Sequence, residues 1–285
     1  MSDYLDATRI RSLAAQLNLR PSKGRGQNFL FDANTIRRIV GLAELGDDDV
    51  VLEIGPGLGS LTAGLLHTPV RVVAVEIEPA LADRLPVTMA ELIPEAQDRL
   101  SVITADALKI DQVSPAPTAL VANLPYNISV PVILHLLASF PTITHGLVLV
   151  QSEVADRLAA GPGSRVYGVP SAKLAWWAAA RRVGTVPPTV FWPAPNVDSG
   201  LVSFTRRDPP PDADRAATFA LIDAAFSSRR KMLRSVLAKK YGPVIFQALS
   251  DAGVTPQARG ETLSIDDFAK VSRALDRLSR ASPTE

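Results

Sequence analysis

The sequence predicts an α/β protein in which a mostly parallel, doubly wound sheet precedes a small all-α domain. Between residues 50 and 150, short apolar runs rich in Val, Ile and Leu alternate with helical patterns, which favours parallel strands joined by helices. After residue 207 the spacing of apolar residues is helical only. The 285 residues are enough for two unequal domains.

Seven segments are predicted to be strands. The first five are only four or five residues long and strongly apolar, as expected for strands that are buried on both faces of a sheet. In chain order, the seven segments cover residues 50–54, 71–75, 101–105, 119–122, 146–150, 182–186 and 200–205. The proline-rich segment 186–195 is predicted to be an extended loop, because proline fixes φ and removes a hydrogen-bond donor.

Helices are predicted between and after these strands. Asp32 or Asn34 is the expected cap of the first helix, and Ser264 with Asp267 resembles a capping box at the start of the last. The predicted helices cover residues 34–42, 61–66, 79–96, 130–139, 152–160, 170–180, 216–226, 230–240, 243–251 and 265–280. A stiff, polar linker is predicted at 206–212, so we expect domains at 1–207 and 208–285.

Composition excludes several kinds of functional site. Without cysteine the chain has no disulfide scaffold, thiolate nucleophile, iron–sulfur cluster or cysteine-ligated zinc. His67, His135 and His145 match no metal-ligand spacing, so no metal is expected. No apolar run approaches the ~18 residues of a membrane span, and Met1 to Arg20 lack the apolar centre of a signal peptide. We therefore expect a soluble, cytoplasmic protein with no membrane partner.

Charge is distributed unevenly along the chain, although the net charge is only +1. Residues 44–111 are predominantly acidic, whereas 20–38 and 224–250 are predominantly basic. This asymmetry suggests that a polyanion docks on one side of the molecule, the alternative being a solvated helix face. The basic residues of the second stretch are Arg229, Arg230, Lys231, Arg234, Lys239 and Lys240.

A glycine turn and two carboxylates form a candidate cofactor site. Gly55, Gly57 and Gly59 follow the first sheet strand, where glycine allows positive φ and close approach of the backbone to a ligand. Glu76 ends the next strand, and a carboxylate there can accept from both hydroxyls of a ribose. Asp106 follows the third strand and can accept from an adenine amine. All of them lie at strand carboxyl ends, where open α/β sheets bind ligands.

Two cofactors compete for such a site. A dinucleotide needs the spacing G-x-G-x-x-G, but here the third glycine comes one residue early and no hydride-transfer residues follow. The spacing instead suits S-adenosylmethionine, with its methionine end over the glycine turn.

The segment Asn123-Leu124-Pro125-Tyr126, after the fourth strand, is the sharpest catalytic feature. An adenine N6 amine is a poor nucleophile, because its lone pair is delocalised into the ring. Two acceptors, the Asn123 amide oxygen and the Pro125 carbonyl, can hold both N–H groups and free the lone pair to attack a sulfonium methyl. Tyr126 is expected to stack on the base.

Phe191 is a candidate for the opposite face of the base, because it lies on a proline-stiffened loop. The alternative is an aromatic side chain that packs in the core. For Trp176 and Trp177, which lie in an alanine-rich stretch, core packing is the expected role.

With these motifs in order, nearly the whole chain resembles the small-subunit ribosomal RNA adenine N6-dimethyltransferase family. The resemblance includes an N-terminal motif at 26–30 and further segments at 151–157, 197–199, 226–231 and 259–263. It implies a Rossmann-like, seven-stranded methyltransferase sheet. It also implies transfer of four methyl groups from S-adenosylmethionine to two adjacent adenosines near the 3′ end of small-subunit rRNA, naked or in a partly assembled subunit.

The resemblance implies roles for individual residues as well. The cofactor site would be lined by Asn28, Leu30, Gly55, Gly57, Glu76, Asp106 and Asn123. Beside these, the chemistry of the Asn-Leu-Pro-Tyr segment predicts Asn123, Pro125 and Tyr126 as catalytic residues, and Phe191 is a candidate substrate contact. We expect Arg229, Arg230, Lys231 and Arg234 to contact RNA phosphates rather than base edges. Nothing in the sequence demands more than a monomer.

Two alternatives stay open. The related large-subunit rRNA dimethylases of macrolide resistance share the cofactor and catalytic motifs, but the basic segment at 226–234 and the signature at 259–263 favour the small-subunit branch. The other alternative is a non-catalytic ribosome-assembly factor on the same scaffold. The chain departs from the family at Ala105, where glycine is usual, and at Ser235, where asparagine is frequent.

Overall fold

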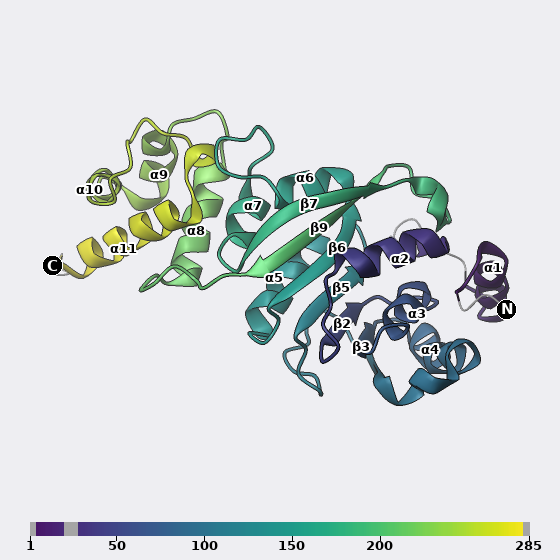
Figure 1. Ribbon diagram of the computed structural model, residues 1–285. Helices are drawn as coiled ribbons and strands as arrows, with labels where there is room; N and C mark the ends of the chain where they lie inside the picture. Colours follow the sequence, from purple (N-terminus) through teal and green to yellow (C-terminus); the bar gives the residue numbers. More distant parts are fainter. Residues whose placement is uncertain (1–3, 20–27, 282–285) are drawn as a thin grey trace. The chain divides into compact units, whose positions relative to one another are not determined.

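The computed structural model describes residues 4–19 and 28–281. The chain divides into two compact units (Figure 1): residues 1–155 with 180–206, and residues 156–179 with 207–285. These units differ from the predicted domains at residues 156–179, which belong by their contacts to the second unit. Residues 20–27, which include Gly26 and Gln27 of the N-terminal motif and part of the first basic stretch, lie outside the described residues.

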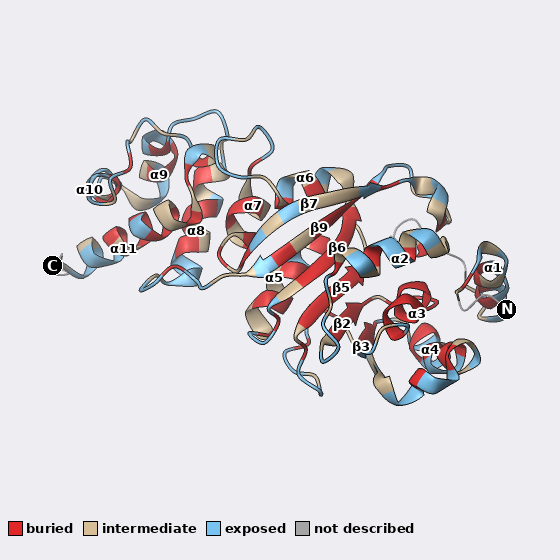
Figure 2. Ribbon diagram, in the orientation of Figure 1, coloured by how far each residue is buried: buried red, intermediate tan, exposed pale blue. Residues whose placement is uncertain are grey.

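The first unit is built on the predicted seven-stranded sheet, in the order β4-β3-β2-β5-β6-β9-β7 (Figure 1). The neighbouring strands from β4 to β6 in this order all pair in parallel, whereas β9 runs antiparallel to β6. The strands are β2 (Val50–Ile54), β3 (Arg71–Glu76), β4 (Leu100–Thr104), β5 (Ala119–Asn123), β6 (His145–Gln151), β7 (Ala178–Val186) and β9 (Ser199–Arg206). The central strands are largely buried (Figure 2), which explains their continuous apolar runs.

The first helix of this unit was not predicted, and the others lie close to the predicted ranges. The helices are α1 (Ala7–Gln16), α2 (Ala33–Leu42), α3 (Ser60–Leu66), α4 (Pro79–Leu92), α5 (Ser129–Ser139) and α6 (Ser152–Leu158), whose last residues belong to the second unit. Asp32 is the cap of α2, because its side chain accepts from the Thr35 N–H at 2.7 Å. The helix predicted at 79–96 continues through Pro86 but ends at Leu92, because the residue before a proline, here Ile93 before Pro94, is disfavoured in the helical conformation. A 3₁₀ helix (Pro94–Arg99) follows.

A two-stranded ribbon joins the N-terminal segment to the proline-rich loop. β1 (Phe29–Leu30) pairs antiparallel with β8 (Phe191–Trp192), with Phe29 opposite Trp192 and Leu30 opposite Phe191. The rings of Phe29 and Trp192 stack with centroids 6.4 Å apart. The loop predicted at 186–195 therefore contains a short strand and, at Pro188–Val190, a 3₁₀ helix.

The helix predicted at 170–180 is wrong in its second half. α7 (Val169–Leu174) ends early, and β7 begins at Ala178. The alanines at 178–180 have high helix propensity, but pairing at the sheet edge overrides it.

The second unit is helical, as the periodicity after residue 207 predicted. Besides α7 it contains α8 (Arg215–Phe226), α9 (Leu233–Tyr241), α10 (Val244–Asp251) and α11 (Ile265–Ala281). Ser264 and Asp267 bond reciprocally at the start of α11, side chain to backbone N–H in each direction at 3.1 Å, which confirms the capping box. α9 begins three residues later than predicted, after a turn that carries Arg229 and Arg230. Among the described residues, no helix is both long and apolar enough to cross a membrane.

Candidate active site

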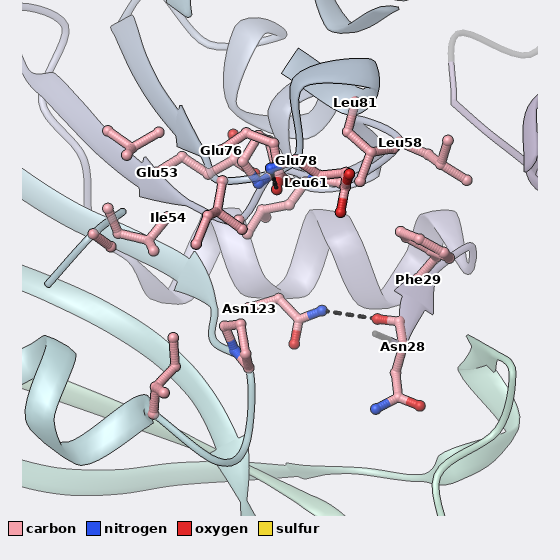
Figure 3. Close-up of a pocket in the computed structure, with 18 of the residues that line it drawn as sticks. Asn28, Phe29, Glu53, Ile54, Leu58, Leu61, Glu76, Glu78, Leu81 and Asn123 are labelled. Atoms are coloured by element: carbon pink, nitrogen blue, oxygen red, sulfur yellow. Dashed lines mark hydrogen bonds between the residues drawn. The ribbon is translucent and has the colours of Figure 1, made fainter. Parts of the chain in front are cut away.

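A cavity of about 580 Å³ opens at the carboxyl ends of the parallel strands (Figure 3). The residues that the resemblance assigns to the cofactor line it, together with Pro125, whereas Gly59 of the glycine turn does not. These residues are Asn28, Leu30, Gly55, Gly57, Glu76, Asp106, Asn123 and Pro125. The parallel strands bring together the residues from Gly55 to Pro125, because the carboxyl ends of these strands meet at one edge of the sheet. Asn28 and Leu30 come from the β1 segment, outside this sheet.

The glycine turn forms one wall of the cavity. Gly55 and Gly57 have φ of 66° and 58°, which other residues adopt only with strain. A Cβ at Gly57 would lie 2.9 Å from a carbon of the Phe29 ring, so this position also lacks space for a side chain. The turn therefore leaves backbone, rather than side chains, facing a ligand.

Glu76 ties the glycine turn to the end of β3. Its Oε2 accepts from the Gly57 N–H at 3.1 Å and its Oε1 from the Glu78 N–H at 3.0 Å. The side chain is 5% exposed, and burial raises the pKa of its carboxyl above the ordinary value. Each carboxylate oxygen has further acceptor capacity for a ligand hydroxyl.

Glu53, which was not predicted as a site residue, is a second buried carboxyl in the cavity wall. It is 1% exposed, and its Oε2 accepts from the Thr62 hydroxyl at 2.7 Å. Burial raises the pKa of Glu53 to about 8, a shift that the Thr62 bond opposes and the charge of Glu76 reinforces. An acidic residue inside an otherwise apolar strand was the available signal, because such a side chain is rarely buried without a function.

Asn123 is held in one orientation by the N-terminal segment. Its Nδ2 donates to the Asn28 carbonyl at 3.2 Å (Figure 3). Because a carbonyl only accepts, the amide nitrogen of Asn123 must face Asn28. The amide oxygen, Oδ1, then points away from Asn28 and can accept a hydrogen bond. Within the described part of the chain, no hydrogen bond to that oxygen is present.

The backbone after Asn123 is fixed as well. The Leu124 N–H donates to the Leu149 carbonyl at 3.0 Å, and the Ile128 N–H donates to the Pro125 carbonyl at 3.2 Å. The Pro125 carbonyl thus forms one hydrogen bond and has a second lone pair available.

Tyr126 and Phe191 do not line the cavity. The Tyr126 hydroxyl lies 2.6 Å from the Ser199 hydroxyl, and burial raises the pKa of the phenol. Phe191 is 3% exposed and packs in the hydrophobic core of the first unit. Its position favours the core-packing alternative over contact with a substrate base.

Asp106 lies in the cavity wall beyond β4. Its Oδ1 accepts from the Leu108 N–H at 3.0 Å, and its Oδ2 is 3.7 Å from the exposed Lys109 ammonium. Both oxygens keep acceptor capacity, so the side chain suits a ligand amine.

The residues present fit a nucleoside cofactor with a polar tail. Gly57 lies in a cradle that a side chain would fill, and Glu76 offers buried acceptors beside it. Ser60, also in the wall, has a buried hydroxyl with no hydrogen-bond partner among the described residues. Searched over those same residues, no group of three His, Asp or Glu side chains could hold a metal ion.

The basic residues of the second unit differ in their surroundings. The Arg229 guanidinium donates to the carbonyls of Tyr167 and Arg165 and pairs with Glu261 at 3.1 Å. These bonds connect three segments of the unit, and the Arg229 side chain remains 43% exposed. The exposed side chains of Arg230, Lys231 and Arg234 form no such bonds within the described residues.

Comparisons with known proteins point in one direction. The model of the ribosomal RNA adenine dimethylase family matches residues 18–277. The chain is 58% identical over 280 residues to ribosomal RNA small subunit methyltransferase A of Cutibacterium acnes, covering 95% of this chain and 94% of that protein. It is 56% identical over 268 residues to the protein of the same name from Streptomyces coelicolor, covering 92% and 94%.

Two solved structures are similar over most of the chain. The 23S rRNA methyltransferase ErmE has a TM-score of 0.64 and 29% identity, over 87% of this chain and all 100% of that one. A dimethyladenosine transferase from Plasmodium falciparum has a TM-score of 0.76 and 24% identity, over 88% and 98%. The second likeness bears on the fold alone.

Proposed function

The chain belongs to the ribosomal RNA adenine dimethylase family, and from this premise we propose that it uses S-adenosylmethionine to dimethylate the N6 amines of adenosines in small-subunit ribosomal RNA. The observation that carries the proposal is the orientation of Asn123. Its Nδ2 is engaged by the Asn28 carbonyl, and its Oδ1 remains available as an acceptor at the cavity wall. An acceptor there is what an adenine amine needs in order to become a nucleophile.

In this proposal, different residues of the cavity bind different parts of the cofactor. Glu76, Asp106 and the turn at Gly55 and Gly57 line the cavity. Glu76 would accept from the ribose hydroxyls and Asp106 from the adenine amine, and the turn would receive the methionine end. Asn28 and Leu30 close the cavity from the N-terminal side. When bound, S-adenosylmethionine supplies an electrophilic methyl group on a sulfonium sulfur.

The catalytic segment activates the target amine. Asn123 Oδ1 and the Pro125 carbonyl accept from the two N–H groups of N6, which draws the nitrogen toward tetrahedral geometry and frees its lone pair. Tyr126 stacks on the base, an interaction worth about 1–3 kcal/mol. No strong general base is required, because the N6 proton becomes acidic once the nitrogen carries positive charge. The adenosine must be unstacked from its RNA to reach this site.

The target is taken to be two adjacent adenosines near the 3′ end of small-subunit rRNA, either naked or within a partly assembled subunit. In this proposal residues 1–207 form the catalytic domain and residues 208–285 the helical RNA-recognition domain. Arg230, Lys231 and Arg234 of the second domain contact phosphates, while Arg229 supports the fold around them. The protein acts as a monomer in the cytoplasm, where it meets ribosomal subunits.

Two other functions use the same scaffold. Methylation of large-subunit rRNA is favoured by the 29% identity to ErmE, but the relatives named for the small subunit are far more similar, at 54–58% identity. A non-catalytic assembly role would not need Asn123 to be held by a dedicated hydrogen bond.

Transfer of tritiated methyl groups tests the proposal directly. Unmethylated small subunits and, in parallel, large subunits are incubated with the protein and labelled S-adenosylmethionine, and mass spectrometry locates the modified nucleotides. We expect dimethyladenosine in small-subunit rRNA only. Label in large-subunit rRNA would favour a large-subunit rRNA dimethylase. Absence of label from both rRNAs would favour a non-catalytic assembly factor.

A further inference from the structure

The Tyr126 side chain is anchored to a strand that does not adjoin its own. Its phenol oxygen lies 2.6 Å from the hydroxyl of Ser199, the first residue of β9. Tyr126 follows β5, and the sheet order β5-β6-β9 puts one strand between the two. The bond therefore spans β6 and connects the catalytic segment to the far strand.

Ser199 itself has a rigid position. It is 0% exposed, and it pairs with Gln151 at the end of β6. The residue before it is also fixed, because the Ser152 N–H donates to the Asp198 carbonyl at 2.9 Å. A hydroxyl held this firmly can define the position of a side chain that bonds to it.

Tyr126 lies in the chain between two residues of the cavity wall. Its sequence neighbours Pro125 and Asn127 line the cofactor cavity, whereas Tyr126 does not. Backbone bonds at Leu124 and Pro125 fix the main chain of this segment. They leave the two side-chain torsions of Tyr126 unspecified, and the bond to Ser199 restrains both.

The phenol is unsuited to proton transfer. Burial raises the pKa of Tyr126 above its ordinary value, so the hydroxyl stays protonated at neutral pH. Its hydrogen bond to Ser199 is therefore a structural contact, and its effect on catalysis must come from orientation.

We propose that Ser199 is a positioning residue for methyl transfer, which holds the Tyr126 ring in the orientation that stacks on the target adenine. Through that stack, Ser199 determines where N6 lies relative to Asn123 Oδ1 and the Pro125 carbonyl. The inference rests on the proposed function, because it needs an adenine as the substrate. Small displacements of a reacting atom lower rates strongly, so one remote hydrogen bond can affect turnover.

A double-mutant cycle tests the coupling. Ser199→Ala and Tyr126→Phe each remove one hydroxyl of the pair and keep the ring. We expect each to lower kcat for methyl transfer to small subunits about three- to ten-fold, the effect of one neutral hydrogen bond. The double variant should be no slower than either single variant. Calorimetry with S-adenosylhomocysteine should give unchanged affinity in all of them.

Ser129→Ala is the matched control. Ser129 is 1% exposed, and its hydroxyl donates to the Tyr126 carbonyl at 3.4 Å rather than to the phenol. Its effect on kcat should be the same whether residue 126 is tyrosine or phenylalanine. If Ser199 only supported the fold, Ser199→Ala would likewise lower kcat by the same factor with tyrosine or phenylalanine at position 126.

Two outcomes would overturn the positioning role. One is wild-type kcat in Ser199→Ala, and the other is an equal fall in kcat when the change is made in the Tyr126→Phe background. If Ser199→Ala does not fold, Tyr126→Phe alone must still show the expected fall with unchanged cofactor affinity. A wild-type protein that transfers no methyl group to small subunits would remove the proposed function, and this inference with it.

Discussion

The amide nitrogen of Asn123 donates to the main-chain carbonyl of Asn28, which lies 95 residues earlier in the sequence, at 3.2 Å. Asn28 directly precedes β1, and β1 is held by its pairing with β8. The orientation of the Asn123 amide is therefore linked to a ribbon formed by two segments outside the main sheet.

Replacement of Asn123 by alanine should abolish methyl transfer and spare cofactor binding. The change removes one of two acceptors for the target amine, and loss of one preorganised hydrogen-bonding group in an active site costs about 100- to 1,000-fold in kcat. Single-turnover methyl transfer to small subunits measures the loss, and calorimetry with S-adenosylhomocysteine measures the binding. Near-normal turnover would contradict the role of Asn123.

Asn123→Asp is the informative companion variant. A carboxylate keeps an acceptor but cannot donate to the Asn28 carbonyl, so it should be turned out of position. We expect it to be nearly as slow as Asn123→Ala. Wild-type rates for Asn123→Asp would mean that the bond to Asn28 is not needed.

Gly57→Ala should weaken cofactor binding through a direct steric effect. The new Cβ would lie 2.9 Å from the Phe29 ring, and the residue would keep a φ of 58° only at a cost of about 1–2 kcal/mol. The turn or Phe29 must move, and both line the cavity. We expect at least a ten-fold higher Kd for S-adenosylhomocysteine by calorimetry.

Gly253→Ala separates backbone strain from loss of space. Gly253 has a φ of 69°, but no atom lies within 4 Å of its added Cβ. Gly253→Ala should lower the melting temperature, because alanine is strained at this φ. It should leave the Kd for S-adenosylhomocysteine unchanged. Equal effects of the two variants on the Kd would show that the cavity does not depend on the shape of the glycine turn.

The sheet and the cofactor cavity could be predicted because local patterns encode them. The strands at 50–54 and 71–76 are marked by continuous apolar runs, and Gly55, Glu76 and Asp106 follow such runs directly. In a parallel sheet, strand ends converge without any knowledge of side-chain contacts. Sequence position alone was therefore sufficient to bring these residues together.

Other features depend on contacts between distant residues, and sequence patterns do not report these. The bond from Tyr126 to Ser199 joins residues 73 positions apart, and β8 exists only because β1 pairs with it. Arg229 looked like a free cation in a basic run, but its partners Tyr167 and Glu261 are far away in the sequence. The strand at 178–180 was missed because pairing overrides the helix propensity of alanine.

Glu53→Gln should stabilise the protein most at alkaline pH. The pKa of Glu53 rises from 4.5 to about 8 on folding, so the native state keeps a proton between these pH values that the unfolded state has released. Stability therefore falls as pH rises through this range, and the full penalty is present above about pH 8. The neutral amide has no such penalty. Its gain in melting temperature over the wild type should be larger at pH 8.5 than at pH 5.

Glu95→Gln serves as the control, because the Glu95 side chain is exposed. It should change the melting temperature by similar amounts at both pH values. An equal gain for Glu53→Gln at pH 5 and pH 8.5 would mean that Glu53 is ionised in the folded protein throughout this range.

Arg229 and Arg230 are adjacent arginines with different surroundings in the structure. Arg229 bonds two carbonyls and Glu261, whereas the exposed Arg230 forms no bond of this kind within the described residues. Arg229→Gln should lower the free energy of unfolding by about 1–3 kcal/mol, because hydrogen bonds to a charged group are lost. Arg230→Gln should change it by less than about 0.5 kcal/mol. Urea unfolding measures both.

RNA binding should show the opposite order. Arg230→Gln removes a proposed phosphate contact, so the slope of log affinity against log salt should flatten by about 0.7–0.9 units. Arg229→Gln, measured where it is fully folded, should leave the slope near the wild-type value, because its guanidinium is engaged within the protein. Filter binding to small-subunit rRNA over a salt series gives both slopes. If Arg229→Gln flattens the slope without loss of stability, Arg229 contacts RNA phosphate. Its bonds to Tyr167 and Glu261 then do not contribute to folding.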